Sequence, residues 1–375
     1  MKLSDVASGF DYGIAAASTK YDGKNKYIRI TDIDESSRKY KVIDPVSPDA
    51  ILDDKYLVQE NDILLARTGA SVGKAYLYDK KDGNLYFAGF LIRINIFKDN
   101  ANFIFAQTFT NNYWKWVNST SMRSGQPGIN SKEYATYSFY TTSKPEQDKI
   151  ANFIALIDRR IYLQNEIIDK LKSYKRGVLF SIFSDKSSNI KLDSLLKIGK
   201  AGGTPKSTTA KYYNGNIPFL NISDMTNQGK YIYTTTKKIT EAGIENSSAW
   251  LVPKNSIILS MYASYGFVSI NKIELATSQA MFSMVPNNEI SYSYLYHYLN
   301  YLSFTNVYER MVSTGTQPNL NAEKIKNIPI YLPTFDKQNF ITTLLDLLDD
   351  YIYKQEKLFK RTNDLKSYLL QKLFI

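Results

Sequence analysis

The polar residues that could contact a ligand lie in short loops that follow apolar, strand-like runs. One such loop, Gly69–Lys74, places glycine, serine and lysine directly after the run 62–66. Its spacing is one residue short for a nucleotide-binding P-loop, and Ala75 stands where Ser or Thr would bind magnesium. We therefore expect the backbone amides and hydroxyl groups of this loop to contact phosphates or base edges of a nucleic acid.

Two more loops, 122–130 and 312–321, are polar and contain Gly and Pro. Arg can make bidentate contacts to guanine and Gln to adenine, while Ser and Thr contact bases or phosphates. The alternative is that these loops are only turns, in which case the Gln-Pro pair that they share is scaffold or a phosphate contact. The candidate nucleic-acid contacts from all of these segments are Arg67, Thr68, Ser71, Lys74, Arg123, Ser124, Gln126, Lys206, Ser260, Tyr262, Ser264, Tyr265, Thr314, Thr316 and Gln317.

The sequence contains no recognisable set of catalytic residues. His297 is the single histidine, and its apolar, aromatic neighbours predict a packed core position. One histidine and no cysteine exclude Cys/His nucleophiles and multi-histidine metal sites. The Asp/Asn-Pro-Pro-aromatic signature of amino-methyltransferases and Gly-x-Gly cofactor loops are both missing. A metal-dependent nuclease site at Asp32, Asp34 and Glu35 would lack its paired Glu-x-Lys.

Composition favours a basic, globular protein with a polyanionic partner. The chain has 375 residues, of which 43% are hydrophobic, and a formal net charge of +11. The alternative is a basic protein without such a partner. The absence of cysteine fits a reducing compartment, and no signal peptide or membrane span is evident. We therefore expect a soluble, cytoplasmic protein with no membrane partner.

The elements that must position these loops occur twice. Gln126-Pro127 and Gln317-Pro318 are 191 residues apart, the difference between 317 and 126. The same offset, without a gap, relates Gln147 to Gln338, Asp158 to Asp349, Tyr162 to Tyr353 and Phe183 to Phe374. Such a repeat predicts two copies of one unit related by an internal two-fold axis, which suits duplex DNA as a ligand.

Four segments follow along the chain. Residues 1–142 and 185–333 contain short β-like runs broken by turn residues, whereas 143–184 and 334–375 each read as one long helix with a capping residue at its start. The predicted fold is α+β. Two β-rich domains alternate with two long helices that pair as an antiparallel coiled coil, with pseudo-two-fold symmetry.

The helices carry matching heptad seams. The seam from Ile150 to Ile182 recurs from Ile341 to Leu373. A seam this narrow favours a helix pair, although two amphipathic helices packed on separate sheets are the alternative. A helix of about 38 residues is roughly 57 Å long, the rise of about 17 base pairs, so the helices can hold two DNA-reading domains apart.

The seams are interrupted by Gln164 and Gln355, and by Lys175 and Lys366. In an antiparallel pair the two glutamines meet at the centre and fix the register, while the lysines reach water near the ends. The alternative is that both glutamines point to solvent. Leu at both glutamine positions should raise stability and loosen the register.

The order of the motifs resembles a known family. The relevant stretches are Gly202–Lys206, Tyr213, 217–225, 251–260, 317–321 and 369–374. Together with the alternation of variable domain and helix, they resemble the specificity (S) subunit of type I restriction–modification systems over essentially the whole chain. The domains are then a first target-recognition domain (1–142), a first spacer helix (143–184), a second target-recognition domain (185–333) and a second spacer helix (334–375).

The resemblance implies a subunit with no chemistry or cofactor of its own. Each recognition domain would read one half of a bipartite DNA target, and the helices would dock two methyltransferase (M) subunits that methylate adenine. Partner subunits would bind S-adenosylmethionine, ATP and Mg, and motor-nuclease (R) subunits would add restriction. Two departures are the Tyr12–Ala15 opening, which indicates another class of recognition domain, and the change from Glu146 to Lys337 between the helices.

Two other functions are left open by the sequence. One is a DNA-modifying enzyme with a divergent active site, and the other is a structural coiled-coil scaffold. Methylation and cleavage assays of the purified chain test the first, and salt-dependent DNA binding tests the second.

Overall fold

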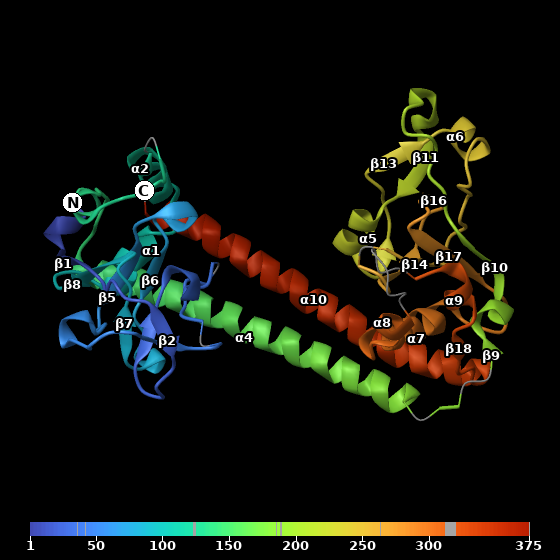
Figure 1. Cartoon of the computed structure of the whole chain (residues 1–375), viewed down its shortest axis with the longest axis horizontal. Helices are drawn as coiled ribbons and strands as arrows, with labels where there is room; N and C mark the ends of the chain where they lie inside the picture. Colours follow the sequence, from blue (N-terminus) through green and yellow to red (C-terminus); the bar gives the residue numbers. More distant parts are fainter. Residues whose placement is uncertain are drawn as a thin grey trace. The chain divides into compact units, whose positions relative to one another are not determined.

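The computed structural model describes the chain apart from residues 36, 42, 123–124, 185, 188–189, 263, 312–319 and 375. It divides into two compact units (Figure 1). The first unit is Met1–Asn165 with Lys357–Ile375, and the second is Glu166–Glu356. Both long helices, α4 (Lys144–Phe183) and α10 (Phe335–Leu373), therefore contribute one part to each unit. Among the described residues, no helix is long and apolar enough to cross a membrane.

The first unit is built on a four-stranded antiparallel sheet in the order β1-β8-β5-β6. Alternate residues of β5 point to opposite faces. Ile63 and Leu65 pack with α1, α2 and the long helices, whereas Leu64 packs under the short β3–β7 pair. The elements are β1 (Ala7–Tyr12), β2 (Ser18–Lys20), β3 (Lys26–Ile28), β4 (Val46–Pro48), β5 (Asp62–Ala66), β6 (Ala75–Leu77), β7 (Leu85–Phe87), β8 (Leu91–Ile96), α1 (Ala101–Gln107), α2 (Asn111–Ser121) and α3 (Ser131–Ala135).

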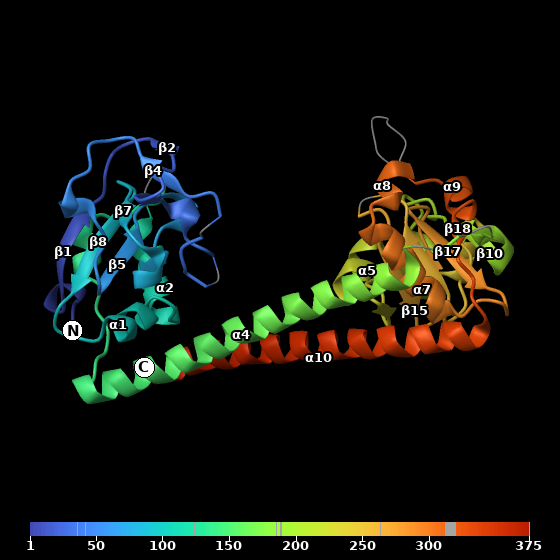
Figure 2. The ribbon, with the colours of Figure 1, turned by 90° about the horizontal axis from the view of Figure 1, so that it is seen from below.

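The second unit has a five-stranded sheet in the order β10-β17-β14-β15-β12 and a three-stranded sheet, β13-β11-β16. Its core joins β14, β15 and β17 to α7 and to the long helices (Figure 2). The elements are β9 (Ile190–Lys191), β10 (Leu196–Ala201), β11 (Tyr213–Leu220), α5 (Ile222–Gln228), β12 (Tyr231–Ile232), β13 (Lys237–Ile239), α6 (Glu241–Glu245), β14 (Ile257–Ser260), β15 (Val268–Asn271), β16 (Ala276–Thr277), β17 (Met281–Pro286), α7 (Tyr292–Phe304), α8 (Val307–Met311), α9 (Ala322–Lys326) and β18 (Pro329–Ile330).

In each unit the strands of the main sheet are followed by three helices, α1 to α3 or α7 to α9, and then by a long helix, which confirms the predicted repeat and fold class. Helices α1 and α7 begin 191 residues apart, and α3 and α9 match at both ends. Their N-caps match as well, because Asn130 accepts the amide of Glu133 and Asn321 accepts that of Lys324. The helices inside each domain were not predicted from the sequence.

The long helices are antiparallel. In the second unit Lys172 Nζ lies 2.7 Å from Glu356 Oε1, and Lys175 pairs with Asp349, so numbers rise along one helix as they fall along the other. In the first unit Lys366 Nζ lies 2.6 Å from Asp158 Oδ1. The prediction that Lys175 and Lys366 reach water is wrong, because their side chains are 17% and 16% exposed and each is neutralised by an aspartate of the other helix.

The seam glutamines are not exposed. Gln164, in the first unit, is 7% exposed, and Gln355, in the second unit, is half-buried. The alternative in which both point to solvent is therefore wrong. That the two amides meet and set the register stays a prediction.

A repeated glutamine joins each domain to the start of a long helix. Gln147 Oε1 accepts the amide of Asn100 at 3.0 Å, and its Nε2 donates to Thr142 O at 2.9 Å. Gln338 Oε1 accepts the amide of Ser291 at 2.9 Å, and its Nε2 donates to Pro333 O at 3.1 Å. Each of the three residues in the second unit lies 191 positions after its counterpart in the first unit. The repeat therefore duplicates this contact between domain and helix as well as the helix itself.

We expect Gln147→Ala and Gln338→Ala each to lower the free energy of unfolding by about 1–3 kcal/mol, because each removes a buried side chain that binds partly buried backbone groups. Urea denaturation measures the loss, and hydrogen exchange at the amides of Asn100 and Ser291 locates it. Gln59→Ala, at an exposed position, is the control. Unchanged protection of both amides would show that the two glutamines do not hold the domains to the long helices.

Candidate nucleic-acid interface

In the first unit two of the predicted loops lie side by side. The carbonyl of Arg67 accepts the amide of Ile129 at 2.9 Å, and the amide of Gly69 donates to Pro127 O at 3.0 Å. Gly69 has a φ of +73°, and a Cβ there would lie 3.1 Å from the side-chain nitrogen Nε2 of Gln126. The turn and the second loop therefore form one polar surface that includes Arg67, Thr68, Ser71 and Gln126.

Two aromatic residues that sequence reasoning missed flank Arg67. The guanidinium carbon lies 4.7 Å from the ring centre of Tyr12, whose hydroxyl accepts the amide of Ser131 at 3.1 Å. Phe90, whose carbonyl accepts the amide of Arg67, is 63% exposed. Exposed aromatics beside a stacked guanidinium are suited to bases, and the signal in the sequence was only their position next to turn glycines.

Lys74 does not belong to this surface. It is 4% exposed, and its ammonium pairs with Glu35 and donates to Ile33 O at 3.3 Å. Gly73, with a φ of +84°, lets the chain turn inward at this point. The predicted phosphate contact by Lys74 is therefore wrong, because its side chain is buried and its charge is compensated inside the domain.

The carboxylates considered for a nuclease site are also engaged. Asp32 Oδ1 lies 2.8 Å from the guanidinium of Arg29. Glu35 pairs with Lys74, and the hydrogen bond from that ammonium lowers the pKa of Glu35. Two carboxylates that are already neutralised by separate cations do not form a metal-binding pair.

The second unit repeats the arrangement of loops. The carbonyl of Met261 accepts the amide of Leu320 at 3.0 Å, as Arg67 accepts that of Ile129, and the two amide positions differ by 191. Exposed Tyr262 and Ser264 and half-buried Tyr265 lie in this turn. The predicted contacts Arg123 and Ser124 of the first unit, and Thr314, Thr316 and Gln317 of the second, lie outside the described residues.

Ser260 is scaffold rather than a ligand contact. It has 0% exposure, and its hydroxyl accepts the amide of Phe267 at 3.2 Å and donates to Ser264 O. The prediction that it contacts nucleic acid is wrong for this reason. What it does is hold the turn that presents Tyr262 and Ser264.

The Gly202-Gly203 pair brings a third segment to this surface. The amide of Gly203 donates to Thr277 O at 2.9 Å, and a Cβ on either glycine would lie within 2.4 Å of backbone atoms. Only glycine fits so close a crossing. Exposed Lys206 follows, and Thr204 donates to Gln279 at 2.5 Å. Gln279 is another exposed residue that sequence reasoning missed.

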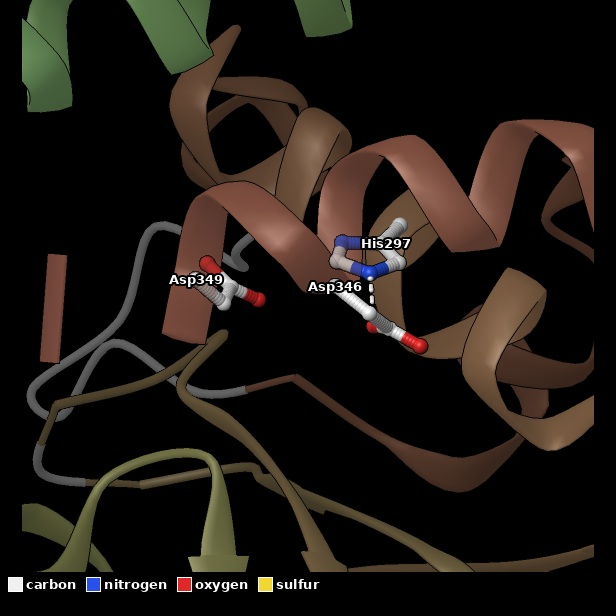
Figure 3. A group of neighbouring side chains, drawn as sticks. All are labelled: His297, Asp346 and Asp349. Atoms are coloured by element: carbon white, nitrogen blue, oxygen red, sulfur yellow. Dashed lines mark hydrogen bonds and ion pairs between the residues drawn. The ribbon is translucent and has the colours of Figure 1, made fainter. Parts of the chain in front are cut away.

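His297 is a core residue, as predicted. Its Nε2 lies 2.7 Å from Asp346 Oδ1 (Figure 3), and within the described chain its buried Nδ1 has no hydrogen-bond partner. A neutral imidazole that donates from Nε2 satisfies both facts, since an N–H at Nδ1 would be buried without an acceptor. Burial also lowers the pKa of His297, which favours the neutral imidazole.

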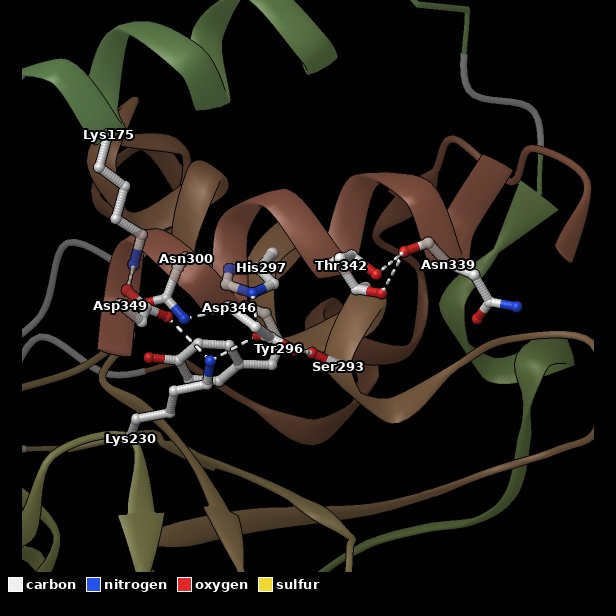
Figure 4. Close-up of polar contacts among 11 residues, drawn as sticks. Lys175, Lys230, Ser293, Tyr296, His297, Asn300, Asn339, Thr342, Asp346 and Asp349 are labelled. Carbon is white, nitrogen blue, oxygen red and sulfur yellow. Dashed lines mark hydrogen bonds and ion pairs between the residues drawn. The ribbon is translucent and has the colours of Figure 1, made fainter. Parts of the chain in front are cut away.

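His297, Asp346 and Asp349 have ligand atoms close enough to suggest a metal site. The group does not fit one, because the ammonium of Lys230 lies 2.6 Å from Asp346 Oδ1 and 2.9 Å from Asp349 Oδ2 (Figure 4). Lys175 also pairs with Asp349. Two ammonium groups already compensate the two carboxylates, so this cluster is a structural network.

The lowered pKa of His297 predicts a pH dependence of stability. In the unfolded chain His297 binds a proton near pH 6.5. In the folded chain its imidazole is still neutral at that pH. The free energy of unfolding should therefore fall below about pH 6.5, by at most about 1.4 kcal/mol per pH unit.

Urea denaturation between about pH 8 and pH 5 measures this effect, because that range brackets the ordinary pKa of histidine. In His297→Gln, whose amide can still donate to Asp346, this part of the pH dependence should disappear. An identical pH dependence in the variant and the parent would show that His297 is not responsible.

Comparison with known proteins agrees with this architecture. The family model for the type I restriction modification DNA specificity domain matches residues 2–173 and 185–363. The MjaIX specificity subunit of Methanocaldococcus jannaschii is 29% identical over 158 residues, which are 42% of this chain and 36% of that protein. The EcoR124I/EcoR124II specificity subunit of Escherichia coli is 24% identical over 210 residues, or 53% and 51% of the two chains.

The matches thus span about half, or less, of the length of these relatives. A crystal structure of a type I restriction-modification system S subunit from M. genitalium shares the fold, with a TM-score of 0.62, 20% identity and coverage of 100% of this chain and 95% of that one. Since the family model covers both halves, the chain belongs to the type I restriction modification DNA specificity domain family.

Proposed function

We propose that the chain reads a bipartite, asymmetric DNA target, one half with each recognition domain, and directs adenine methylation and restriction by partner subunits. The observation that carries this proposal is a duplicated scaffold with different contact residues. The same loop-to-loop hydrogen bond, Ile129 to Arg67 and Leu320 to Met261, supports unlike side chains in the two units. Two such surfaces are suited to two different half-sites.

Charge and side-chain type favour duplex DNA as the ligand. The chain carries a formal net charge of +11, which attracts the phosphate backbone. Arg67 and Gln126 in the first unit offer the bidentate donors and acceptors that read guanine and adenine in the major groove. Lys206 and Gln279 bring comparable groups to the surface of the second unit.

The helix pair supplies a surface for the methyltransferase partners. In the second unit a groove of about 560 Å³ lies between the end of α4 and the start of α10. It is lined mainly by apolar side chains, and Phe340 beside it is 75% exposed. Exposed apolar surface of this kind marks a protein interface. On this proposal S-adenosylmethionine, ATP and Mg are bound by the M and R subunits.

The purified chain should bind DNA weakly and transfer no methyl group. Methylation should appear only when a methyltransferase subunit and S-adenosylmethionine are added, because the sequence has no recognisable set of catalytic residues for the reaction. Incorporation of labelled methyl groups into target DNA measures both states. Methylation by the highly purified chain alone would favour a divergent DNA-modifying enzyme instead.

Arg67 and Lys74 should respond differently to substitution. Arg67→Ala should cost about 1–3 kcal/mol of specific binding and relax one base position, if the guanidinium reads a guanine. Lys74→Met should leave the salt dependence of binding unchanged, since this lysine is buried. Titrations over a range of salt, against target and scrambled duplexes, compare the two. Equal losses on both duplexes for Arg67→Ala would assign it to phosphate contact only.

The helices should set the gap between half-sites. Deleting one heptad from each, at positions 191 residues apart, shortens the pair by about 10.5 Å, the rise of about three base pairs. We expect methylation to move to a correspondingly shorter gap, with both half-sites unchanged. Sequencing of methylated sites from a random-gap library measures this, and an unaltered gap would contradict the ruler function.

A further inference from the structure

The second recognition domain is joined to the long helices by a polar network that is mostly buried (Figure 4). Lys230 directly precedes β12, the edge strand of the five-stranded sheet. Its ammonium reaches Asp346 and Asp349 on α10, and it lies 5.1 Å from the ring centre of Tyr296 on α7. One lysine thus connects the sheet edge, α7 and α10.

Asp346 is the centre of the network. Besides Lys230, its carboxylate accepts the hydroxyl of Ser293 at 2.9 and 3.0 Å and meets His297 Nε2 at 2.7 Å. Ser293 and His297 both belong to α7, whereas Lys230 approaches from the sheet. Contacts from two separate elements of the domain therefore converge on one side chain of the long helix.

The first unit does not have the side chains that α7 and α10 contribute to this network. At the offset of 191 residues, Asp346 corresponds to Ala155, His297 to Ala106 and Ser293 to Asn102. The ion pair of Lys175 with Asp349 does recur, as Lys366 with Asp158. The helix-to-helix contact is therefore shared by both repeats, while the contact from domain to helix through Asp346 belongs to the second domain.

The network is balanced in charge. Lys175 and Lys230 carry two positive charges, Asp346 and Asp349 carry two negative charges, and His297 is neutral. A buried ion pair seldom stabilises a fold more than well-packed apolar side chains would, but its directional bonds can select one geometry. Ala106, the counterpart of His297, is buried in the first unit without any side-chain hydrogen bond, so burial at this position does not require the network.

We propose that Lys230, His297 and Asp346 are positioning residues that set the orientation of the second recognition domain on the long helices, and through it the placement of the second half-site. The inference rests on the proposed function and deepens it. A rotation of the domain about α10 would move Lys230 and His297 away from Asp346 together. Apolar replacements would keep the surface buried but would let neighbouring orientations coexist.

The test variant is Lys230→Met with His297→Leu and Asp346→Leu, which leaves Asp349 paired with Lys175. The matched control is Lys172→Met with Glu356→Leu, which removes an ion pair between the same two helices and leaves Lys230, His297 and Asp346 unchanged. Lys230→Met alone is a milder second variant, since Asp346 keeps His297 and Ser293. If the triple variant does not fold, the same measurements are made on Lys230→Met.

The direct measurement is the distance distribution between two spin labels in the full chain. The chain has no cysteine, so Lys238→Cys on β13 and Asp350→Cys on α10, both exposed, can be labelled cleanly. We expect one narrow distribution for the parent and the control, and a broader or shifted one for the triple variant. The same narrow distribution in all three would overturn the proposal.

The second measurement is methylation by the complex reconstituted with its methyltransferase, over targets that differ only in gap length. The preference for the correct gap over its neighbours should fall by about tenfold in the triple variant and stay unchanged in the control. An unchanged preference in a folded triple variant would refute the role in placement. If the parent complex methylates no bipartite target, the proposed function fails, while the spin-label result still decides the orientation.

Discussion

Reciprocal ion pairs between the long helices are the interactions on which the rest of the molecule depends. Lys175 pairs with Asp349 and Lys366 with Asp158, and an offset of 191 residues turns one pair into the other. Each cation is mostly shielded from water, so a shift of one helix along the other would leave buried charges without partners, at a cost of several kcal/mol. An antiparallel register follows, and with it the position at which each helix meets its recognition domain.

The domains are attached to this frame by a glutamine contact that both units repeat and by further contacts that differ between the units. Gln147 and Gln338 bind the backbone at the start of α1 and α7, which ties each domain core to a long helix in the same way. The network around Asp346 adds directional contacts from the second domain. On the proposed function, a shared frame that carries unlike contact surfaces is the physical basis for reading two different half-sites.

The sequence predicted what repetition and periodicity encode. The paired offsets at Gln147 and Asp158 indicated two copies of one scaffold. The heptad seam indicated that the long helices pair, and the two-fold symmetry of the repeat indicated that they are antiparallel. The apolar neighbours of His297 placed it in the core. Repetition and periodicity do not encode the direction in which a side chain points within a loop. Lys74 follows a glycine in a polar loop, yet Gly73 directs it inward to Glu35.

Other errors share that cause. Lys175 and Lys366 interrupt an apolar seam, and only their aspartate partners on the opposite helix, distant in sequence, keep them from water. The hydroxyl of Ser260 supports its own turn instead of reaching a ligand. Tyr12 and Phe90 escaped notice because an exposed aromatic residue has the same sequence signature as a buried one. Helices such as α7 were missed because they are buried on most sides and lack a polar stripe.

The central claim is that this chain selects a bipartite DNA target for methylation by its partners. Methylation-sensitive sequencing of the host genome, with and without a functional copy of this chain, tests it most directly. The account predicts methylated adenines at one motif of two unlike half-sites separated by a fixed gap, and their complete loss when the chain is inactivated. Persistence of the same methylation without the chain, or a motif with a single uninterrupted site, would contradict it.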